Sequence, residues 1–285
     1  MTTTFDYSEP ATWPEAAALL RQGGDDAMVL AGGTAFTLLL RQGLIRPSYV
    51  VGLRRIRDAA RIDVDAHGGI SIGSTATHSA VARSSAISAS WPELADAALK
   101  VATVRVRNQA TLGGSVAHAD PASDAPVMLA ALAAQVVVLS EAGPRRVPIE
   151  DLIVDTFTTS LGPAELIHSV EIPGRDPRTR AAYLKFTLRS VDDYATVSVG
   201  ARADIANGTF RDLRIFLGAV GPRPMRATSV EEALRGQTVD PRRFGDAASL
   251  VRGDIDPIDD LRGSASYKRE MARVWTERAL VALAS

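Results

Sequence analysis

The sequence has no cysteine among its 285 residues. Without cysteine, the chain forms no disulfide bond, no thiolate zinc site and no thiolate-ligated iron–sulfur cluster, and it has no cysteine nucleophile. An iron–sulfur cluster that takes part in its function would therefore belong to another polypeptide.

Histidine is scarce as well, and the four that are present form no metal-binding pattern. His67, His78, His118 and His168 do not occur in a paired motif such as H-E-x-x-H. The segment Gly113–Ser115 lacks the G-x-S-x-G pattern of a hydrolase nucleophile. The sequence therefore predicts no metal site and no Ser-His-Asp hydrolase.

An excess of one charge and a long apolar run are also missing. The 32 basic and 33 acidic residues give a net charge of −1 and are scattered, so we expect no nucleic-acid partner. The longest apolar run, Val127–Leu139, is interrupted by Gln135 and is shorter than the roughly 20 residues that span a bilayer. Residues 1–10 lack the basic start and apolar centre of a signal peptide. We therefore expect a cytoplasmic protein that does not bind a membrane.

The remaining composition is that of a globular protein, because 46% of the residues are hydrophobic and 23% are charged. At roughly 150 residues per domain, the chain is long enough for two domains. The order of expected strands and helices is typical of an α+β fold.

Two glycine pairs lie in short segments that are rich in small residues. The first segment, Leu30–Phe36 (L-A-G-G-T-A-F), follows the strand-like run Ala27–Ala31 and precedes a helical pattern at 36–42. The second is Thr111–Asp124 (T-L-G-G-S-V-A-H-A-D-P-A-S-D). Glycine adopts positive φ easily and lets backbone N–H groups approach an anion, which a helix N-terminus also favours. Each loop alone is equally typical of a tight turn or a helix cap. The two together suggest one large ligand.

The pattern around the first loop predicts a compact β-loop-α-β unit, with its second strand at 49–53. The glycines are adjacent, so the G-x-G-x-x-G fingerprint of a Rossmann nicotinamide domain is absent. Alternation and turn residues predict a hairpin at 61–73 and another at 196–218, the latter around Asn207-Gly208. Further helices are expected at 91–105, 121–134, 229–235 and 266–284, and further strands at 135–139, 166–173 and 182–189. The charged stretch 174–180 is the expected domain boundary.

Five separated segments carry a family resemblance in the same order along the chain. They are F-D-Y-x-x-P at Phe5–Pro10, A-G-G-T at Ala31–Thr34, R-N-Q-A-T-L-G-G-S-V-A-H-A-D-P-A-S-D at Arg107–Asp124, R-x-x-x-D-Y-A at Arg189–Ala195 and Y-K-R-E-M-A-R-V-W at Tyr267–Trp275. Together they resemble the FAD-binding medium subunit of molybdenum-containing hydroxylases, the family of carbon monoxide dehydrogenase and xanthine dehydrogenase.

The resemblance implies a domain organisation. A two-subdomain FAD-binding domain of the PCMH type would occupy residues 1–174, with subdomains at about 1–57 and 58–174. A smaller α+β C-terminal domain with an antiparallel sheet and helices would occupy 175–285.

The resemblance also implies FAD as the cofactor. The backbone of Ala31–Phe36 would hold the pyrophosphate, Thr111, Gly114 and Ser115 would line the other side, and Asp124 would accept ribose hydroxyl groups. The chemistry belongs to the flavin, so no catalytic residue is named. The full set of implied FAD-binding residues is Leu30, Ala31, Gly32, Gly33, Thr34, Ala35, Phe36, Thr75, Ala102, Thr111, Gly113, Gly114, Ser115, Asp120, Asp124, Ile167, Lys185 and Tyr194.

Several of these positions have an alternative interpretation. Asp124 would alternatively be an acidic residue in the first turn of a helix, where acids are favoured, without any contact to a ligand. Lys185 would stabilise an anionic reduced flavin or would lie on the solvent face of its strand. Tyr194 would lie beside the isoalloxazine ring or at the edge of the core. Ala35 and Ser115 depart from the family pattern, so side-chain hydrogen bonds at those two positions are not implied.

By resemblance, the chain is the electron-transfer subunit of a multi-subunit molybdenum hydroxylase. FAD would receive electrons from an iron–sulfur small subunit and pass them to NAD, a quinone, oxygen or another carrier, while a molybdenum-cofactor large subunit oxidises the substrate. Two alternatives remain: a flavin-free assembly module with the same fold, and a stand-alone flavin oxidase.

Overall fold

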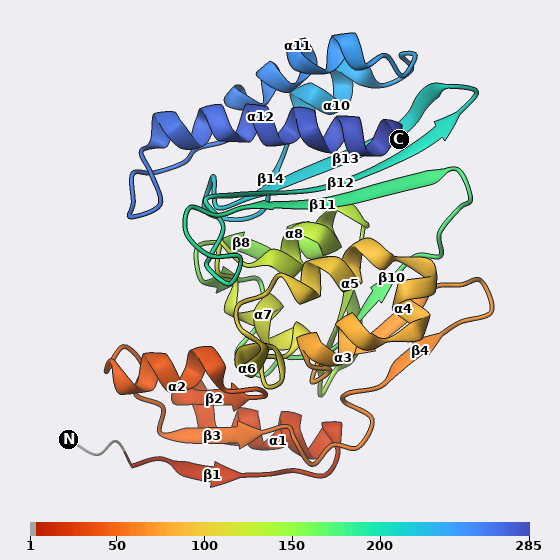
Figure 1. The fold of residues 1–285 in the computed structure, drawn as a ribbon. Helices are drawn as coiled ribbons and strands as arrows, with labels where there is room; N and C mark the ends of the chain where they lie inside the picture. Colours follow the sequence, from red (N-terminus) through yellow and green to blue (C-terminus); the bar gives the residue numbers. More distant parts are fainter. Residues whose placement is uncertain (1–3) are drawn as a thin grey trace.

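The computed structural model describes residues 4–285. It stacks three larger β-sheets along one axis, with helices between and outside them, and a fourth sheet within residues 4–285 has only two strands (Figure 1). The N-terminal unit lies at one end, and the C-terminal helices cover the other end. Strands and helices mix throughout, so the predicted α+β class is confirmed. Within the described residues, no helix combines the length and apolarity needed to cross a membrane.

The N-terminal unit is a three-stranded parallel sheet with two helices, one before and one after the glycine loop in the chain. Its strands, in the order β1-β3-β2, are β1 (Asp6–Ser8), β3 (Tyr49–Gly52) and β2 (Ala27–Leu30). Helix α1 (Trp13–Gly23) precedes β2, and α2 (Thr34–Arg41) connects β2 to β3. The predicted β-loop-α-β unit is therefore confirmed.

The core of this unit contains Trp13 and Leu20 of α1, Val51 of β3 and Ile56 after it, all buried. Leu166, which belongs to the central strand of the neighbouring five-stranded sheet, completes the same cluster. The N-terminal unit therefore shares its core with the neighbouring sheet.

The middle unit is built on a five-stranded antiparallel sheet in the order β4-β5-β10-β6-β7. The expected hairpin at 61–73 is confirmed, and the Asp65 carboxylate accepts from the N–H groups of His67 and Gly69 in its turn. The strands are β4 (Ile62–Val64), β5 (Ile70–Gly73), β6 (Gln135–Ser140), β7 (Gly143–Pro148) and β10 (Leu166–Ile172).

Short helices cover this sheet and lie between it and the C-terminal sheet (Figure 1). They are α3 (His78–Arg83), α4 (Ser85–Ser90), α5 (Pro92–Leu99), α6 (Val104–Arg107), α7 (Leu112–His118) and α8 (Asp124–Ala131). The connection from β7 to β10 contains α9 (Ile149–Leu152), β8 (Ile153–Asp155) and β9 (Thr158–Thr159).

The expected continuous helix at 91–105 is wrong, because the chain breaks after Leu99. Ala102 has a φ of 38°, and Thr103 caps a new helix by accepting from Val106 N. The Arg107 guanidinium donates to the carbonyls of Val101 and Ala102, which satisfies acceptors that the break releases.

The helix expected at 121–134 is shorter at both ends. The Asp120 carboxylate accepts from Ala122 N, and this turn keeps the chain out of a helix until Asp124. At the other end, Ala133 has a φ of 57° and separates α8 from β6.

The C-terminal unit is a four-stranded antiparallel sheet, β11-β12-β13-β14, with α8 on one face and α12 on the other. The expected hairpin around Asn207-Gly208 is confirmed, and both residues have positive φ. The expected strand at 182–189 begins three residues earlier, at Thr179, and also ends three residues earlier, at Phe186. The elements are β11 (Thr179–Phe186), β12 (Val197–Ala206), β13 (Thr209–Gly218), β14 (Met225–Arg226), α10 (Thr228–Leu234), α11 (Phe244–Ser249) and α12 (Ala265–Ala284). Three 3₁₀ turns are η1 (Gly24–Asp26), η2 (Pro241–Arg243) and η3 (Leu250–Gly253).

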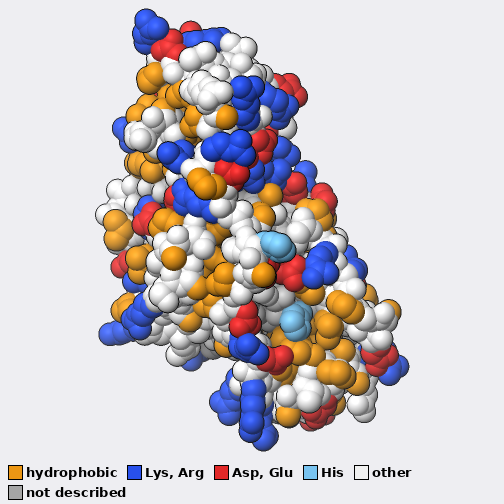
Figure 2. Space-filling model, turned by 90° about the vertical axis from the view of Figure 1, so that its right-hand side faces the viewer, with side chains coloured by type: hydrophobic (Ala, Val, Ile, Leu, Met, Phe, Trp, Pro, Cys, Tyr) orange, Lys and Arg blue, Asp and Glu red, His pale blue; other side chains and the backbone are white. Residues whose placement is uncertain are grey.

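The predicted domain boundary at 174 lies between β10 and β11, outside both strands, and it stays a prediction. On the face shown in Figure 2, acidic and basic side chains lie next to one another over the whole length of the molecule. That face therefore has no continuous stripe of one charge.

Candidate functional site

The first glycine loop presents unpaired backbone donors. Gly33 is in the left-handed region with a φ of 74°, and α2 begins directly after it. The five N–H groups of Gly32–Phe36 donate to no group within residues 4–285, and these residues are partly exposed. Unpaired N–H groups at a helix N-terminus, together with the helix dipole, favour an anion. The expected anion-binding geometry is therefore present in this loop.

Close packing explains why residue 32 is glycine. A Cβ added to Gly32 would overlap the carbonyl oxygen of Gln109 and would lie 2.8 Å from the carbonyl carbon of Gln109 and 3.0 Å from Ala110 Cα. The first loop thus packs directly against the backbone that leads into the second loop. The two glycine segments are neighbours in space, as one shared ligand requires.

The second glycine pair does not present free N–H groups, and the expectation of positive φ there is wrong. Gly113 and Gly114 lie in the first turn of α7. Gly113 N donates to Ser74 O at 2.9 Å, and Gly114 N donates to Thr111 Oγ1 at 3.1 Å. A Cβ on Gly113 would lie 2.5 Å from Ser74 Cβ, so this glycine permits packing. The second segment can therefore contact a ligand mainly through side chains such as Ser115.

A buried histidine supports Ser115. His78 Nε2 and Ser115 Oγ are 2.7 Å apart, and the His78 ring is fully buried. Burial, with a smaller contribution from the positive charge of Arg107, lowers the pKa of His78 from 6.5 to about 4. His78 is therefore neutral at physiological pH.

We expect this histidine to make the stability of the fold depend on pH. Between about pH 6.5 and pH 4, the unfolded chain binds a proton at His78 and the folded chain does not, so stability is lost as the pH falls. The difference between these values corresponds to about 3 kcal/mol. Urea unfolding of the wild type and His78→Gln from neutral pH to about pH 4 measures the effect. The wild type should lose up to about 3 kcal/mol more than the variant; parallel curves would contradict the prediction.

A buried ionic cluster connects α8 to β11. Asp124 accepts from Tyr183 Oη at 2.5 Å and from Lys185 Nζ at 3.0 Å, and Lys185 also donates to Lys100 O at 2.7 Å. The Lys185 side chain is only 4% exposed, so the solvent-face interpretation is wrong. Burial raises the pKa of the Asp124 carboxyl, while Lys185 and Tyr183 oppose this change.

This cluster changes what Asp124 and Lys185 can offer to a ligand. Both carboxylate oxygens of Asp124 already have a protein donor, and the charge of Lys185 is balanced by Asp124. The cluster also fixes the carbonyl of Lys100, directly before the helix break that contains Ala102. A ribose contact by Asp124 and a flavin contact by Lys185 stay predictions.

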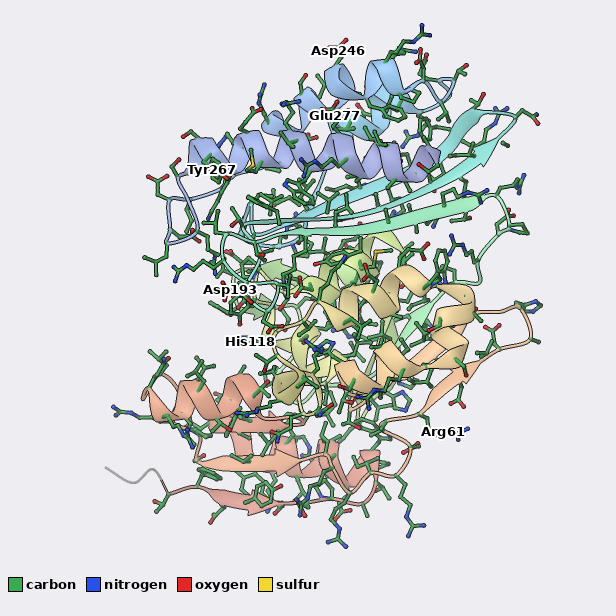
Figure 3. All side chains as sticks on the ribbon, viewed as in Figure 1. Arg61, His118, Asp193, Asp246, Tyr267 and Glu277 are labelled. Atoms are coloured by element: carbon green, nitrogen blue, oxygen red, sulfur yellow. The ribbon has the colours of Figure 1, made fainter. Side chains whose placement is uncertain are left out.

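Tyr194 lies outside the core, in the loop between β11 and β12, and is 54% exposed. The Arg262 guanidinium lies over its ring, 5.7 Å from the centroid. Asp260 holds Arg262 by accepting from its backbone N and from Nη2. In Figure 3, Asp193 of the same loop and His118 at the end of α7 lie on the same side of the molecule. An aromatic side chain is therefore available to a ligand on that side.

The other predicted residues occupy defined places around this region. Thr75 lies between β5 and α3, and its N–H donates to Ala59 O. Asp120 forms the turn before α8, and Ile167 is buried in β10, so it could contact a ligand only through its backbone. Thr111 pairs with Thr77 in an isolated β-bridge, which places the second segment beside α3.

Four residues that contact the predicted site residues or the helix break beside them are not identified by the sequence analysis. They are Lys100, Arg107, Gln109 and Tyr183. Tyr183 and Lys185 are two residues apart on one strand, so the two-residue periodicity places both on one face. This signal alone could have identified Tyr183 as a partner of Lys185. Arg107 acts on carbonyls five and six residues earlier in the chain, whereas Lys100 and Gln109 are involved through contacts between distant parts of the chain.

Comparison with known proteins gives matches over nearly the whole chain. The family model described as the FAD binding domain in molybdopterin dehydrogenase matches residues 3–175, and that of the CO dehydrogenase flavoprotein C-terminal domain matches residues 181–283. A similar protein is the 6-hydroxypseudooxynicotine dehydrogenase complex subunit alpha of Paenarthrobacter nicotinovorans, 34% identical over 97% of this chain and 93% of that protein.

The carbon monoxide dehydrogenase medium chain of Hydrogenophaga pseudoflava is 31% identical over 97% of this chain and 96% of the relative. A solved structure of carbon monoxide dehydrogenase from the same organism, which lacks the Mo-pyranopterin moiety of the molybdenum cofactor, contains a chain with the same fold. That chain superposes with a TM-score of 0.95 at 32% identity, covering 99% of this chain and 98% of the other.

Proposed function

Because the chain belongs to the family of FAD-binding medium subunits of molybdenum hydroxylases, we propose that it carries electrons through FAD from a partner's iron–sulfur clusters to an external acceptor. FAD is the cofactor of the family, and its members are subunits of oxidoreductase complexes. When bound, FAD supplies the capacity to accept electrons from one carrier and deliver them to another.

The observation that carries this proposal is the set of five unpaired N–H groups at Gly32–Phe36. The pyrophosphate of FAD brings two negative charges and several acceptor oxygens, and it fits a row of backbone donors at a helix N-terminus. The hydroxyl of Thr34, the first residue of α2, would add a donor. Gly32 allows this loop to lie against Gln109, so the site keeps its shape before a ligand arrives.

The remaining predicted residues would surround the rest of the cofactor. Ser115 would contact FAD from the second segment, and Tyr194 would cover the isoalloxazine side and exclude water from it. Asp124 and Lys185 would act mainly through the loop that they fix, because they already neutralise each other. Their electrostatic effect on the reduction potential would therefore be smaller than that of a lone lysine.

Electron transfer in this proposal requires other subunits. The chain has no cysteine to ligate an iron–sulfur cluster, so the clusters would belong to a small subunit and the molybdenum cofactor to a large subunit. Exposed apolar side chains near Tyr194 would form part of the contact with these partners, since such residues are usually buried in an interface. They are Leu188 and Val191 of the same loop, and Leu261 beside Arg262. NAD, a quinone, oxygen or another carrier would be the final acceptor.

We expect the purified chain to bind FAD. The measurement is an absorption spectrum of the chain expressed alone, repeated after addition of FAD and removal of the excess by gel filtration. Oxidised-flavin bands that comigrate with the protein would support the proposal and exclude a flavin-free assembly module. Substrate turnover by the chain alone would instead support a stand-alone flavin oxidase.

The contrary outcome needs one further control. A folded chain that takes up no flavin, alone or when co-expressed with the neighbouring subunits of its complex, would contradict the proposed function. FAD uptake only after co-expression would agree with the proposed function and would show that the partner subunits complete the FAD site.

A further inference from the structure

His78 and Ser115 form a pair whose hydrogen bonding is incomplete. His78 Nε2 lies 2.7 Å from Ser115 Oγ, while His78 Nδ1 is buried and has no partner within residues 4–285. The histidine is fully buried, but Ser115 is partly exposed. A serine hydroxyl has one hydrogen to donate and two lone pairs to accept, so Ser115 can form a second bond toward the exposed side.

The direction of that second bond depends on the tautomer of His78. A neutral imidazole carries one proton, either on Nδ1 or on Nε2. With the proton on Nδ1, the buried Nδ1–H group would lack an acceptor, and the Ser115 hydroxyl would donate its hydrogen to Nε2. With the proton on Nε2, His78 donates to Ser115 Oγ and only an acceptor remains unfilled. Buried N–H groups without an acceptor are rarer than under-used acceptors, so the structure favours the proton on Nε2.

The same backbone segment connects this pair to the first glycine loop. His78 N donates to Ala110 O at 3.0 Å, and the Cβ position of Gly32 lies 3.0 Å from Ala110 Cα. The free hydrogen of Ser115 and the unpaired N–H groups that begin at Gly32 therefore belong to one region of the molecule. All of them are donors, which suits an anionic ligand.

We infer that His78 is a positioning residue for FAD: its Nε2–H fixes Ser115 so that the Ser115 hydroxyl donates to an anionic oxygen of the dinucleotide. The inference rests on the proposed function, because it takes FAD as the ligand. His78 does not contact FAD, and its whole effect is exerted through Ser115. Because Nε2–H donates to Ser115 Oγ, the hydrogen of the Ser115 hydroxyl is left to donate to the ligand.

A double-mutant cycle tests this dependence. The dissociation constant of FAD is measured by titration of the flavin-free full chain for wild type, Ser115→Ala, His78→Met and the double variant. A hydrogen bond to a charged acceptor corresponds to about a tenfold to hundredfold change in affinity, so Ser115→Ala should weaken binding by at least about tenfold. His78→Met should weaken it by a similar factor, and it should have no further effect when Ser115 is already alanine.

The matched control is His78→Gln, which has a side-chain N–H group near the position of Nε2. It should restore most of the affinity that His78→Met loses, although the two variants remove the same imidazole ring. Thermal unfolding of each variant without FAD separates a loss of affinity from a loss of fold. Rescue by glutamine is not expected from a residue that only fills space.

NMR spectroscopy of the protein without FAD identifies the tautomer of His78. The ¹⁵N resonances of His78, assigned by comparison with His78→Gln, identify which ring nitrogen carries the proton. A proton on Nε2 supports the inference, and a proton on Nδ1 overturns it.

The affinity data separate this inference from the proposed function. Wild-type protein that binds no FAD overturns both. Wild type that binds FAD as tightly as Ser115→Ala, or single variants whose factors multiply in the double variant, overturns the role of His78 alone.

Discussion

Replacing Gly32 by alanine is expected to reduce the amount of FAD retained by the chain more than tenfold. The new Cβ would overlap the carbonyl oxygen of Gln109, and the groups it meets are backbone atoms that cannot rotate away. Overpacking of this kind costs about 1–3 kcal/mol, and about 1.4 kcal/mol corresponds to a factor of ten in affinity. Because the loop must move to relieve the overlap, its N–H groups would no longer converge on one anion. The measurement is the flavin-to-protein ratio after gel filtration.

Gly253→Ala is the matched control for this change. Gly253 ends η3 in the C-terminal unit, does not have positive φ, and has no atom within 4 Å of an added Cβ. This variant should retain FAD as the wild type does. Equal retention by Gly32→Ala and Gly253→Ala, with both proteins folded, would show that the first glycine loop does not hold the cofactor.

Lys185→Met is expected to lower the free energy of unfolding by about 3–5 kcal/mol, because it leaves the buried carboxylate of Asp124 without its cation. Urea unfolding at neutral pH measures the loss. The double variant Asp124→Asn/Lys185→Met should recover a large part of it, since asparagine still accepts from Tyr183 without carrying a charge. Arg242→Met is the comparison, because it breaks an ion pair in which the arginine is 89% exposed, and such pairs contribute little.

The pH dependence of the same variant gives a second readout. Burial raises the pKa of Asp124, so the stability contributed by this group is fully present below its unfolded value of 3.8 and is lost as the pH rises through the folded value. Lys185 opposes the rise, and its removal raises the pKa further. The stability difference between wild type and Lys185→Met should therefore increase from about pH 4 to neutral pH. A difference that stays constant would show that removing Lys185 does not change the protonation of Asp124, and it would contradict the prediction.

The parts of the fold that were predicted correctly are those with local signals. The hairpin at Asn207-Gly208 needs two adjacent residues with positive φ, and the sequence supplies the pair best suited to it. The break in the helix expected at 91–105 has no such signal. Lys185 fixes the Lys100 carbonyl through a tertiary contact, and Arg107 donates to the carbonyls of Val101 and Ala102 only once the chain has already turned. Strand β7 is not predicted by the sequence analysis. Prolines occur at 144 and 148, and β7 is an edge strand, where proline is tolerated.

The same distinction applies to the site. The first glycine loop was predicted because strand, glycine pair and helix follow one another directly in the sequence. The second was misinterpreted, since the acceptor that occupies Gly113 N is Ser74, nearly forty residues earlier. The pairing of Asp124 with Lys185 joins two separate units of the fold. No local pattern reveals that both charges are buried.

Leu166 has a consequence for the order in which the protein is made. This residue belongs to the same buried cluster as Trp13 and Val51 of the N-terminal unit, but it leaves the ribosome more than a hundred residues after them. At roughly 5–20 residues per second, the nascent N-terminal segment waits on the order of ten seconds for the side chain that completes its core. During that time its apolar surface is open to chaperones and to other nascent chains. A ribosome stalled before residue 166 should therefore display an N-terminal unit that proteases cut readily, and one stalled well beyond it should not.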